Sequence, residues 1–315
     1  MKRKRLLCLL FSFLFVLYGC NDHSNDVTPS KPSSKEEEAL SDFPASPSPK
    51  IEELLLAESP EEKVLEDDDH KVHIDYSHTN LGYIRIKRLD DSGIKMKIRL
   101  TNNEKGNYWY DLNKAGVYET FPLVNGSGTY QLEVRIQVPS TGKYALVYGA
   151  DIDVKLDNEQ IPFLYPNQTV EYDQNSEAIQ KAFALCKDDD NALKRVKSIY
   201  DFVVNDISYD YDKLEKVKDN YVLPVLDETL EKKKGICFDY AALMAGMCRS
   251  QHIPCKVIVG DTERDYHAWV EVWLEGKGWI DPAILFEKDT WTRMDPTYAS
   301  THADYDGEYI TKYEY

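Results

Sequence analysis

Residues 234–260 read KGICFDYAALMAGMCRSQHIPCKVIVG, and residues 267–282 read HAWVEVWLEGKGWIDP. These stretches place Cys237 at the predicted start of a helix and His267 at the predicted start of a strand. Asp281 follows just after a second strand. A cysteine, a histidine and an aspartate can serve as a thiolate nucleophile, its base and the group that orients the base. The two stretches therefore predict a thiol active site.

The run from Cys237 to Ser250 predicts one helix that is apolar on nearly every side, which is typical of a buried helix. A cysteine in the first turn lies beside unpaired backbone N–H groups and the positive end of the helix dipole, which favour a thiolate. The backbone amide of Cys237 can also point at a developing oxyanion. Cys248 lies about three turns along the same helix, roughly 16 Å away, and cannot share this site.

The segment after this helix predicts a cap, a strand and then a hairpin. The helix has to end before Pro254, so His252 is expected to form a left-handed cap rather than to act as a base. Residues 255–260 predict a strand, and residues 275–278 predict the turn of the following hairpin. The register of that hairpin is expected to bring Asp281 back beside His267.

Four short motifs resemble the transglutaminase-like superfamily, which shares the papain-like fold of thiol enzymes. They are Gly235-Ile236-Cys237, Ile253-Pro254, His267-Ala268-Trp269 and Trp279-Ile280-Asp281-Pro282. The resemblance spans about residues 175 to 290. It implies that Cys237 is the nucleophile, that His267 is its base and that Asp281 orients the base.

The resemblance also implies an oxyanion donor upstream of the cysteine. This sequence shows no clear glutamine or tryptophan there, and Asn220 and Tyr221 are the nearest polar and aromatic residues. The candidate oxyanion donors are therefore the amide of Cys237 and the side chain of Tyr221.

The implied reaction is acyl transfer or hydrolysis at a peptide or isopeptide amide, carried out by a cell-surface thiol enzyme. Water or an amine resolves the thioester, so the activity is that of a cysteine peptidase or amidase, or of a protein-glutamine acyltransferase. The mechanism needs no metal and no organic cofactor. We expect a monomer with a peptide or protein substrate, cell-wall peptides included. The alternative is a non-catalytic surface lipoprotein that keeps a transglutaminase-like fold and only binds.

The first residues predict a targeting signal rather than part of a folded domain. Lys2 to Arg5 form a basic start, and residues 6–18 form an apolar run that is too short for an ordinary membrane-spanning helix. The sequence Leu17-Tyr18-Gly19-Cys20 resembles a bacterial lipobox. It implies a signal peptide over residues 1–19, a lipid on Cys20, and an extracytoplasmic protein that is anchored to the bacterial membrane.

Three further regions follow from changes in composition and period. Residues 20–70 are rich in Ser, Pro and acidic residues, which predicts a disordered tether. Residues 71–160 alternate with period two between turn signals, which predicts a β-sandwich-like accessory domain that either binds a ligand or braces its neighbour. Residues 161–315 predict the catalytic domain. The expected fold class is α+β, with the β-sandwich-like domain first and the transglutaminase-like domain after it.

Charge and cysteine spacing exclude other classes of function. The net charge of the 315-residue chain is −17, which disfavours nucleic acid as a partner because its phosphates repel an acidic surface. The cysteines show no C-x-x-C spacing, which argues against a zinc site. Cys186, Cys248 and Cys255 can form disulfides outside the cytoplasm, but they fit better as small buried side chains.

Overall fold

The computed structural model describes residues 43–67, 72–89, 91–102, 106–217, 220–263, 265–280, 297 and 308–315. The predicted signal peptide, Cys20 and Asp281 therefore lie outside the described residues. Within the described part of the chain, no helix is both long enough and apolar enough to span a membrane.

The described elements mix helices and strands. The helical elements are η1 (Ile51–Glu53), η2 (Thr79–Leu81), η3 (Ile161–Phe163), α2 (Glu177–Cys186), α3 (Ala192–Asp206), α4 (Tyr211–Val217), α5 (Leu226–Lys232) and α6 (Cys237–Ser250). The strands are β1 (Val64–Asp67), β2 (Val72–Asp75), β3 (Tyr83–Arg88), β4 (Met96–Asn102), β5 (Gly106–Leu112), β6 (Tyr118–Pro122), β7 (Gly128–Gln137), β8 (Tyr144–Val154), β9 (Ser208–Tyr209), β10 (Lys234–Gly235), β11 (Cys255–Thr262), β12 (Tyr266–Leu274), β13 (Gly278–Ile280) and β14 (Tyr309–Glu314). The predicted α+β class is confirmed.

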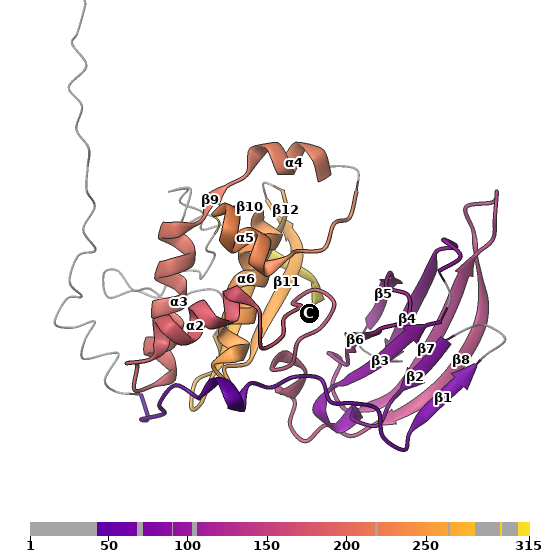
Figure 1. Cartoon of the computed structure of the whole chain (residues 1–315), viewed down its shortest axis with the longest axis horizontal. Coiled ribbons are helices and arrows are strands. Elements are labelled where there is room, and N and C mark those ends of the chain that lie inside the picture. Colours follow the sequence, from indigo (N-terminus) through magenta and orange to yellow (C-terminus); the bar gives the residue numbers. More distant parts are fainter. Residues whose placement is uncertain are drawn as a thin grey trace, which may run out of the picture.

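The N-terminal region is rich in sheet, as the period-two pattern predicts. Its strands form two four-stranded sheets with the orders β1-β2-β3-β6 and β5-β4-β7-β8, and the pairings are antiparallel. Alternate residues of each sheet, such as Ile84 and Ile98, are fully buried and belong to one hydrophobic cluster. Both sheets lie together on the right of Figure 1, apart from the helices.

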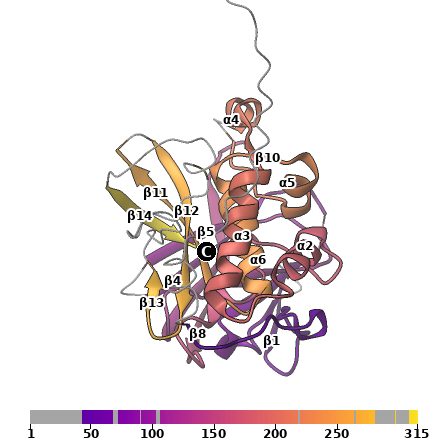
Figure 2. The ribbon, with the colours of Figure 1, turned by 90° about the vertical axis from the view of Figure 1, so that its left-hand side faces the viewer.

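The second region is built around helix α6. Helices α2, α3 and α5 contact α6, and the sheet β13-β12-β11-β14 covers another side of it. Figure 2 shows the helices on one side of this sheet. Because α6 is enclosed in this way, every residue from Asp239 to Ser250 is buried. The prediction of a buried helix is confirmed.

Cysteine packing identifies the face of the sheet that α6 covers. The side chain of Cys255 on β11 lies beside that of Cys248 on α6, and this neighbour together with burial raises the pKa of Cys248 well above its ordinary value. Cys186, Cys248 and Cys255 are buried free thiols, as predicted. Residues that alternate with Cys255 along β11, together with their partners on β12, therefore face the helix.

Two residues hold the end of α6. His252 adopts the predicted left-handed conformation, with φ 57°, directly before the turn into β11. The guanidinium of Arg249 is fully buried and donates to the carbonyl oxygens of Cys255, Tyr165 and Tyr315 at 2.7–3.0 Å. It therefore joins α6 to β11, to the connection between the regions and to the residue after β14.

The segment 43–67 differs from the predicted tether. Ser46 N donates to Asp190 O at 2.6 Å, and Ser48 Oγ donates to Gln251 Oε1 at 2.6 Å. Strand β1 pairs with β2 in the first sheet. The physical reason is that the segment contains apolar side chains that pack against the core, namely Phe43, Leu54, Leu55, Leu56 and Leu65. The described part of this segment is thus attached to the folded regions.

Replacing Arg249 tests its role at the end of α6. In Arg249→Met, three buried carbonyls lose their donor, so we expect the free energy of unfolding to fall by about 3 kcal/mol. Chemical denaturation measures this as a lower midpoint with an unchanged slope. Lys187→Met, which removes a charge from an exposed side chain, is the control and should change stability by less than about 0.5 kcal/mol. Equal stability of the two variants would contradict the assignment.

Candidate active site

Cys237 is the first residue of α6, as predicted. The residue before it, Ile236, is extended, and its N–H donates to Asp239 Oδ2 at 2.9 Å. The other oxygen of this buried carboxylate accepts from Lys213 Nζ at 2.8 Å. Asp239 therefore fixes the chain at the point where it enters the helix, and Lys213 balances its charge.

The backbone before Cys237 is also fixed. Strand β10 pairs in parallel with β9, with Gly235 opposite Tyr209. A Cβ atom at Gly235 would lie 2.7 Å from Asp239 Cβ, which is closer than side-chain atoms approach one another. A glycine is thus required here so that the carboxylate can reach back to the start of the helix. This constraint sets the position of Cys237.

Cys237 differs from the other described cysteines in its exposure. It is partly buried, whereas Cys186, Cys248 and Cys255 are fully buried. Burial raises the pKa of the Cys186 thiol to about 12. Cys237 is therefore the thiol in the described part of the chain that combines access to solvent with a helix N-terminus.

His267 is the second residue of β12 and is paired with Gly260 of β11. From Cys237, α6 runs about 20 Å to Ser250. The chain then reverses, and β11 runs about 17 Å back from Cys255 to Gly260. Because α6 also contacts β12, this return brings His267 to the same end of the layered structure as Cys237.

The ring of His267 is buried at 4% exposure and lies 6.5 Å from the ring of Tyr309 in an edge-on contact. Trp269 contacts the same tyrosine at 4.8 Å, so His267 and Trp269 share a face of β12, as predicted. Alternation places Ala268 on the face that α6 covers. A direct contact between the Cys237 thiol and the imidazole stays a prediction.

The hairpin after β12 has a register other than the one expected. Trp273 pairs with Trp279, and Val272 pairs with Ile280. The last described residue of the hairpin, Ile280, is thus paired five residues along β12 from His267. Asp281 lies outside the described residues, and its role stays a prediction.

Tyr221, the candidate oxyanion donor, lies close to the start of α6. Its ring is 5.9 Å from the ring of Phe238, the neighbour of Cys237. The residue exposes 66% of its surface, yet loss of hydration around its hydroxyl raises its pKa to about 12. The high exposure and the raised pKa agree if the ring faces solvent while other groups surround the hydroxyl. The hydroxyl thus keeps its proton at neutral pH and can donate it in a hydrogen bond.

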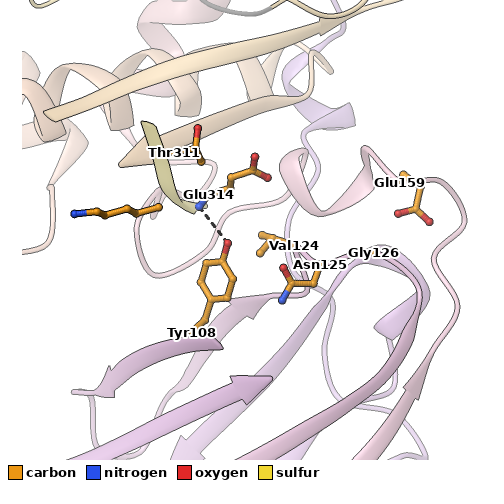
Figure 3. A pocket seen from close by; sticks show the side chains of 8 residues that line it. Tyr108, Val124, Asn125, Gly126, Glu159, Thr311 and Glu314 are labelled. Carbon is orange, nitrogen blue, oxygen red and sulfur yellow. Dashed lines mark hydrogen bonds between the residues drawn. The ribbon is translucent and has the colours of Figure 1, made fainter. Parts of the chain in front are cut away.

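A polar cavity of about 400 Å³ lies between the two regions of the protein, beside β14. Figure 3 shows Thr311 and Glu314 above Tyr108 and Asn125 of the N-terminal region, with Glu159 to the right. The backbone N–H of Glu314 donates to the Tyr108 hydroxyl at 3.3 Å. Since Tyr309 of the same strand contacts His267, β14 connects this cavity with the candidate site.

One group of side chains has the composition of a metal site. Ligand atoms of Glu58, Glu61 and His78 lie within 4.8 Å of one another. The two carboxylates are exposed, and His78 Nδ1 is 3.7 Å from a Glu58 oxygen, as in an ordinary ion pair. We assign it no metal.

Two parts of this arrangement were not predicted. The role of Asp239 was missed, although an acidic residue in the first turn of a helix is a recognised signal for such a contact. The strand β14 was also missed, although its sequence YITKYE alternates in the manner of a strand.

Selective alkylation tests the difference between the thiols. At neutral pH iodoacetamide should modify Cys237 in the folded protein and leave Cys186 and Cys248 unmodified, because burial keeps those two protonated and inaccessible. Peptide mass spectrometry before and after denaturation measures this. Equal modification of all three in the native protein would contradict the described packing.

Several known proteins are similar to parts of this chain. A protein proposed to be a cysteine protease from Cytophaga hutchinsonii is 17% identical, with a TM-score of 0.35, and the likeness covers 74% of this chain and 91% of that one. Red sea bream transglutaminase is 13% identical, with a TM-score of 0.27, over 73% of this chain and 56% of that one. TM-scores this low support no conclusion about fold or function.

Among sequences, YebA of Bacillus subtilis is 28% identical over 120 residues, and the UPF0252 protein MJ1282 of Methanocaldococcus jannaschii is 38% identical over 64 residues. The matches cover 31% and 18% of this chain but only 16% of YebA and 18% of MJ1282. The family model of the transglutaminase-like superfamily matches residues 179–296, which include Cys237, His267 and Asp281. Residues 179–296 of this chain therefore form a transglutaminase-like domain.

Proposed function

We propose that this protein is a thiol enzyme that transfers or hydrolyses the acyl group of peptide or isopeptide amides. One observation carries the proposal. Cys237 is a partly exposed thiol at the N-terminus of a buried helix, and the topology brings His267 to the same end of the structure. Acyl transfer requires a nucleophile and a base within its reach, so contact between the Cys237 thiol and the His267 imidazole is part of the proposal.

In the proposed reaction the thiolate of Cys237 attacks the amide carbonyl, and a carbon–sulfur bond forms. The oxyanion accepts hydrogen bonds from the Cys237 amide and from the Tyr221 hydroxyl. The carbon–nitrogen bond then breaks, and the imidazolium of His267 gives its proton to the leaving amine. Asp281 orients the imidazole and stabilises its positive charge. Water or a second amine then attacks the thioester and gives its proton to His267, the carbon–sulfur bond breaks, and the Cys237 thiolate and the His267 imidazolium are restored.

The cavity beside β14 suits the part of a peptide that flanks the reacting amide. Its lining includes Glu159, Glu314 and the amide of Asn125, and these groups fit a polar chain better than a lipid. We therefore propose a peptide or protein substrate, cell-wall peptides included. The two N-terminal sheets would form an accessory β-sandwich that supplies one wall of this cavity.

Replacing the three candidate residues tests the proposal. Cys237→Ala should abolish release of free acid and of amine-exchange products from a library of peptide amides. His267→Ala should lower turnover by at least about 100-fold, because it removes the general acid and base. Asp281→Asn should lower it less, with a change in the pH profile. Liquid chromatography with mass spectrometry, with and without an added amine, measures both types of product.

The same experiment separates the alternatives. Free acid alone identifies a hydrolase, and amine-exchange products identify a transferase. Tyr211→Phe, which removes the hydroxyl of an exposed side chain on α4, is the control and should keep full activity. If the unmodified protein gives neither product but binds peptides, and Cys237→Ala binds equally well, the non-catalytic binding lipoprotein is the better interpretation.

We further propose that the protein is held outside the cytoplasm by a lipid on Cys20. Cys20→Ser should move the protein from the membrane fraction to the soluble fraction of cells that produce it, because the acyl chains of such an anchor supply the membrane affinity. Fractionation with immunoblotting measures the change. A variant that stays in the membrane fraction would contradict this part of the proposal.

A further inference from the structure

The outer face of the sheet β5-β4-β7-β8 carries an exposed tryptophan. Along β5, Tyr108 and Tyr110 are buried at 8% and 5% exposure, whereas Trp109 between them is 44% exposed. Strand alternation explains this pattern, because Trp109 points away from the core. Packing in the core therefore does not account for a tryptophan at this position.

Two arginines hold the ring of Trp109. The guanidinium carbon of Arg99 lies 5.6 Å from the ring centroid, and that of Arg135 lies 5.7 Å from it. Arg99 is directly opposite Trp109 on β4, and Arg135 is on β7, on the far side of β4. Cation–π attraction to two residues limits the motion of the indole, while much of its surface stays open to solvent.

The arginines are themselves fixed by hydrogen bonds. Arg99 Nε donates to Asn107 Oδ1 at 2.8 Å, and Arg99 Nη1 donates to Glu133 Oε1 at 3.3 Å. Arg135 Nε donates to the second oxygen, Glu133 Oε2, at 2.7 Å. The hydrogen bond from Arg135 is the main reason that the pKa of Glu133 is lowered. These four residues and Trp109 are called the Trp109 platform below.

The Trp109 platform has hydrogen-bond donors on Arg135 that are available to a ligand. Both Glu133 oxygens are engaged, but in the described part of the chain no hydrogen bond or ion pair occupies the two Nη groups of Arg135. Two guanidiniums and one carboxylate leave a local charge of about +1, on a chain whose net charge is −17. A free pair of guanidinium N–H groups matches a carboxylate in a bidentate geometry.

These features point to one class of ligand. A flat, partly open indole presents a surface on which the C–H face of a sugar ring can stack, and Asn107 and Arg99 offer hydrogen-bonding groups to its hydroxyls. Arg135 offers the site for a carboxylate on the same ring. The acidic chain repels any polyanion at long range, so binding here depends on the local positive charge of the Trp109 platform and on its short-range contacts.

We propose that the Trp109 platform binds an acidic polysaccharide, with a uronic acid ring stacked on Trp109 and its carboxylate on Arg135. This site is separate from the candidate active site, and the proposal does not depend on acyl transfer. It gives the N-terminal region a binding role in addition to that of a brace.

Affinity gel electrophoresis of the full chain in detergent tests this binding, with polygalacturonate, alginate and hyaluronan as ligands. At least one of these should retard the protein. Trp109→Ala and Arg135→Met should each weaken that binding by at least about tenfold, which corresponds to about 1.4 kcal/mol. Leu146→Ser, a change of a residue 54% exposed that pairs with Arg135 on the same sheet, is the matched control and should bind as before.

Two comparisons identify the chemical group that is recognised. Highly methyl-esterified pectin, which has the backbone of polygalacturonate without its charges, should bind at least about tenfold more weakly, and added salt should weaken binding to the acid form. Poly-glutamate should not compete. Retardation by none of the three uronates, equal binding by the esterified polymer, competition by poly-glutamate, or unchanged binding by Trp109→Ala would each overturn the proposal. Near-ultraviolet circular dichroism checks that each variant is folded.

Discussion

The burial of Arg249 is the interaction on which the arrangement of the second region depends. A fully buried guanidinium is tolerated only when its donors are satisfied, and here carbonyl oxygens from Cys255, Tyr165 and Tyr315 accept from it. Those three residues come from separate parts of the chain. The requirement to satisfy one charged side chain thus fixes the end of α6 relative to β11, to the inter-region connection and to the C-terminal strand.

The candidate site lies at the opposite end of the same helix. Since α6 is held at Arg249 and capped through Asp239, the position of Cys237 is determined from both directions. The sheet packs on the helix through β11 and β12, and β11 pairs with β12 so that Gly260 lies opposite His267. Placement of Cys237 and of His267 therefore follows from packing in the core.

The sequence predicts the central helix well, but it does not predict the hairpin register or the contacts of segment 43–67. The helix from Cys237 to Ser250 was predictable because an apolar run and a following proline define it locally, and the burial of Cys248 follows from the same run. The hairpin register was not, since a shift of a few residues leaves the alternation of β12 unchanged but changes which residue of β12 is paired with Ile280. The contacts of segment 43–67 were hidden because its few apolar residues are diluted by charged ones, and its binding surfaces lie far away in sequence.

The segment between Ser46 and Glu58 also has a mechanical consequence. At one end it binds the helical region, through Ser48 to Gln251, and at the other the N–H of Glu58 donates to the Tyr83 hydroxyl of the first sheet at 2.9 Å. The chain crosses between the regions again near η3, and β14 touches Tyr108. The two crossings and this contact connect the regions at three places, so the regions resist rotation about any single hinge. A force applied at residue 43 would be resisted first by the helical region, before it could reach the strands.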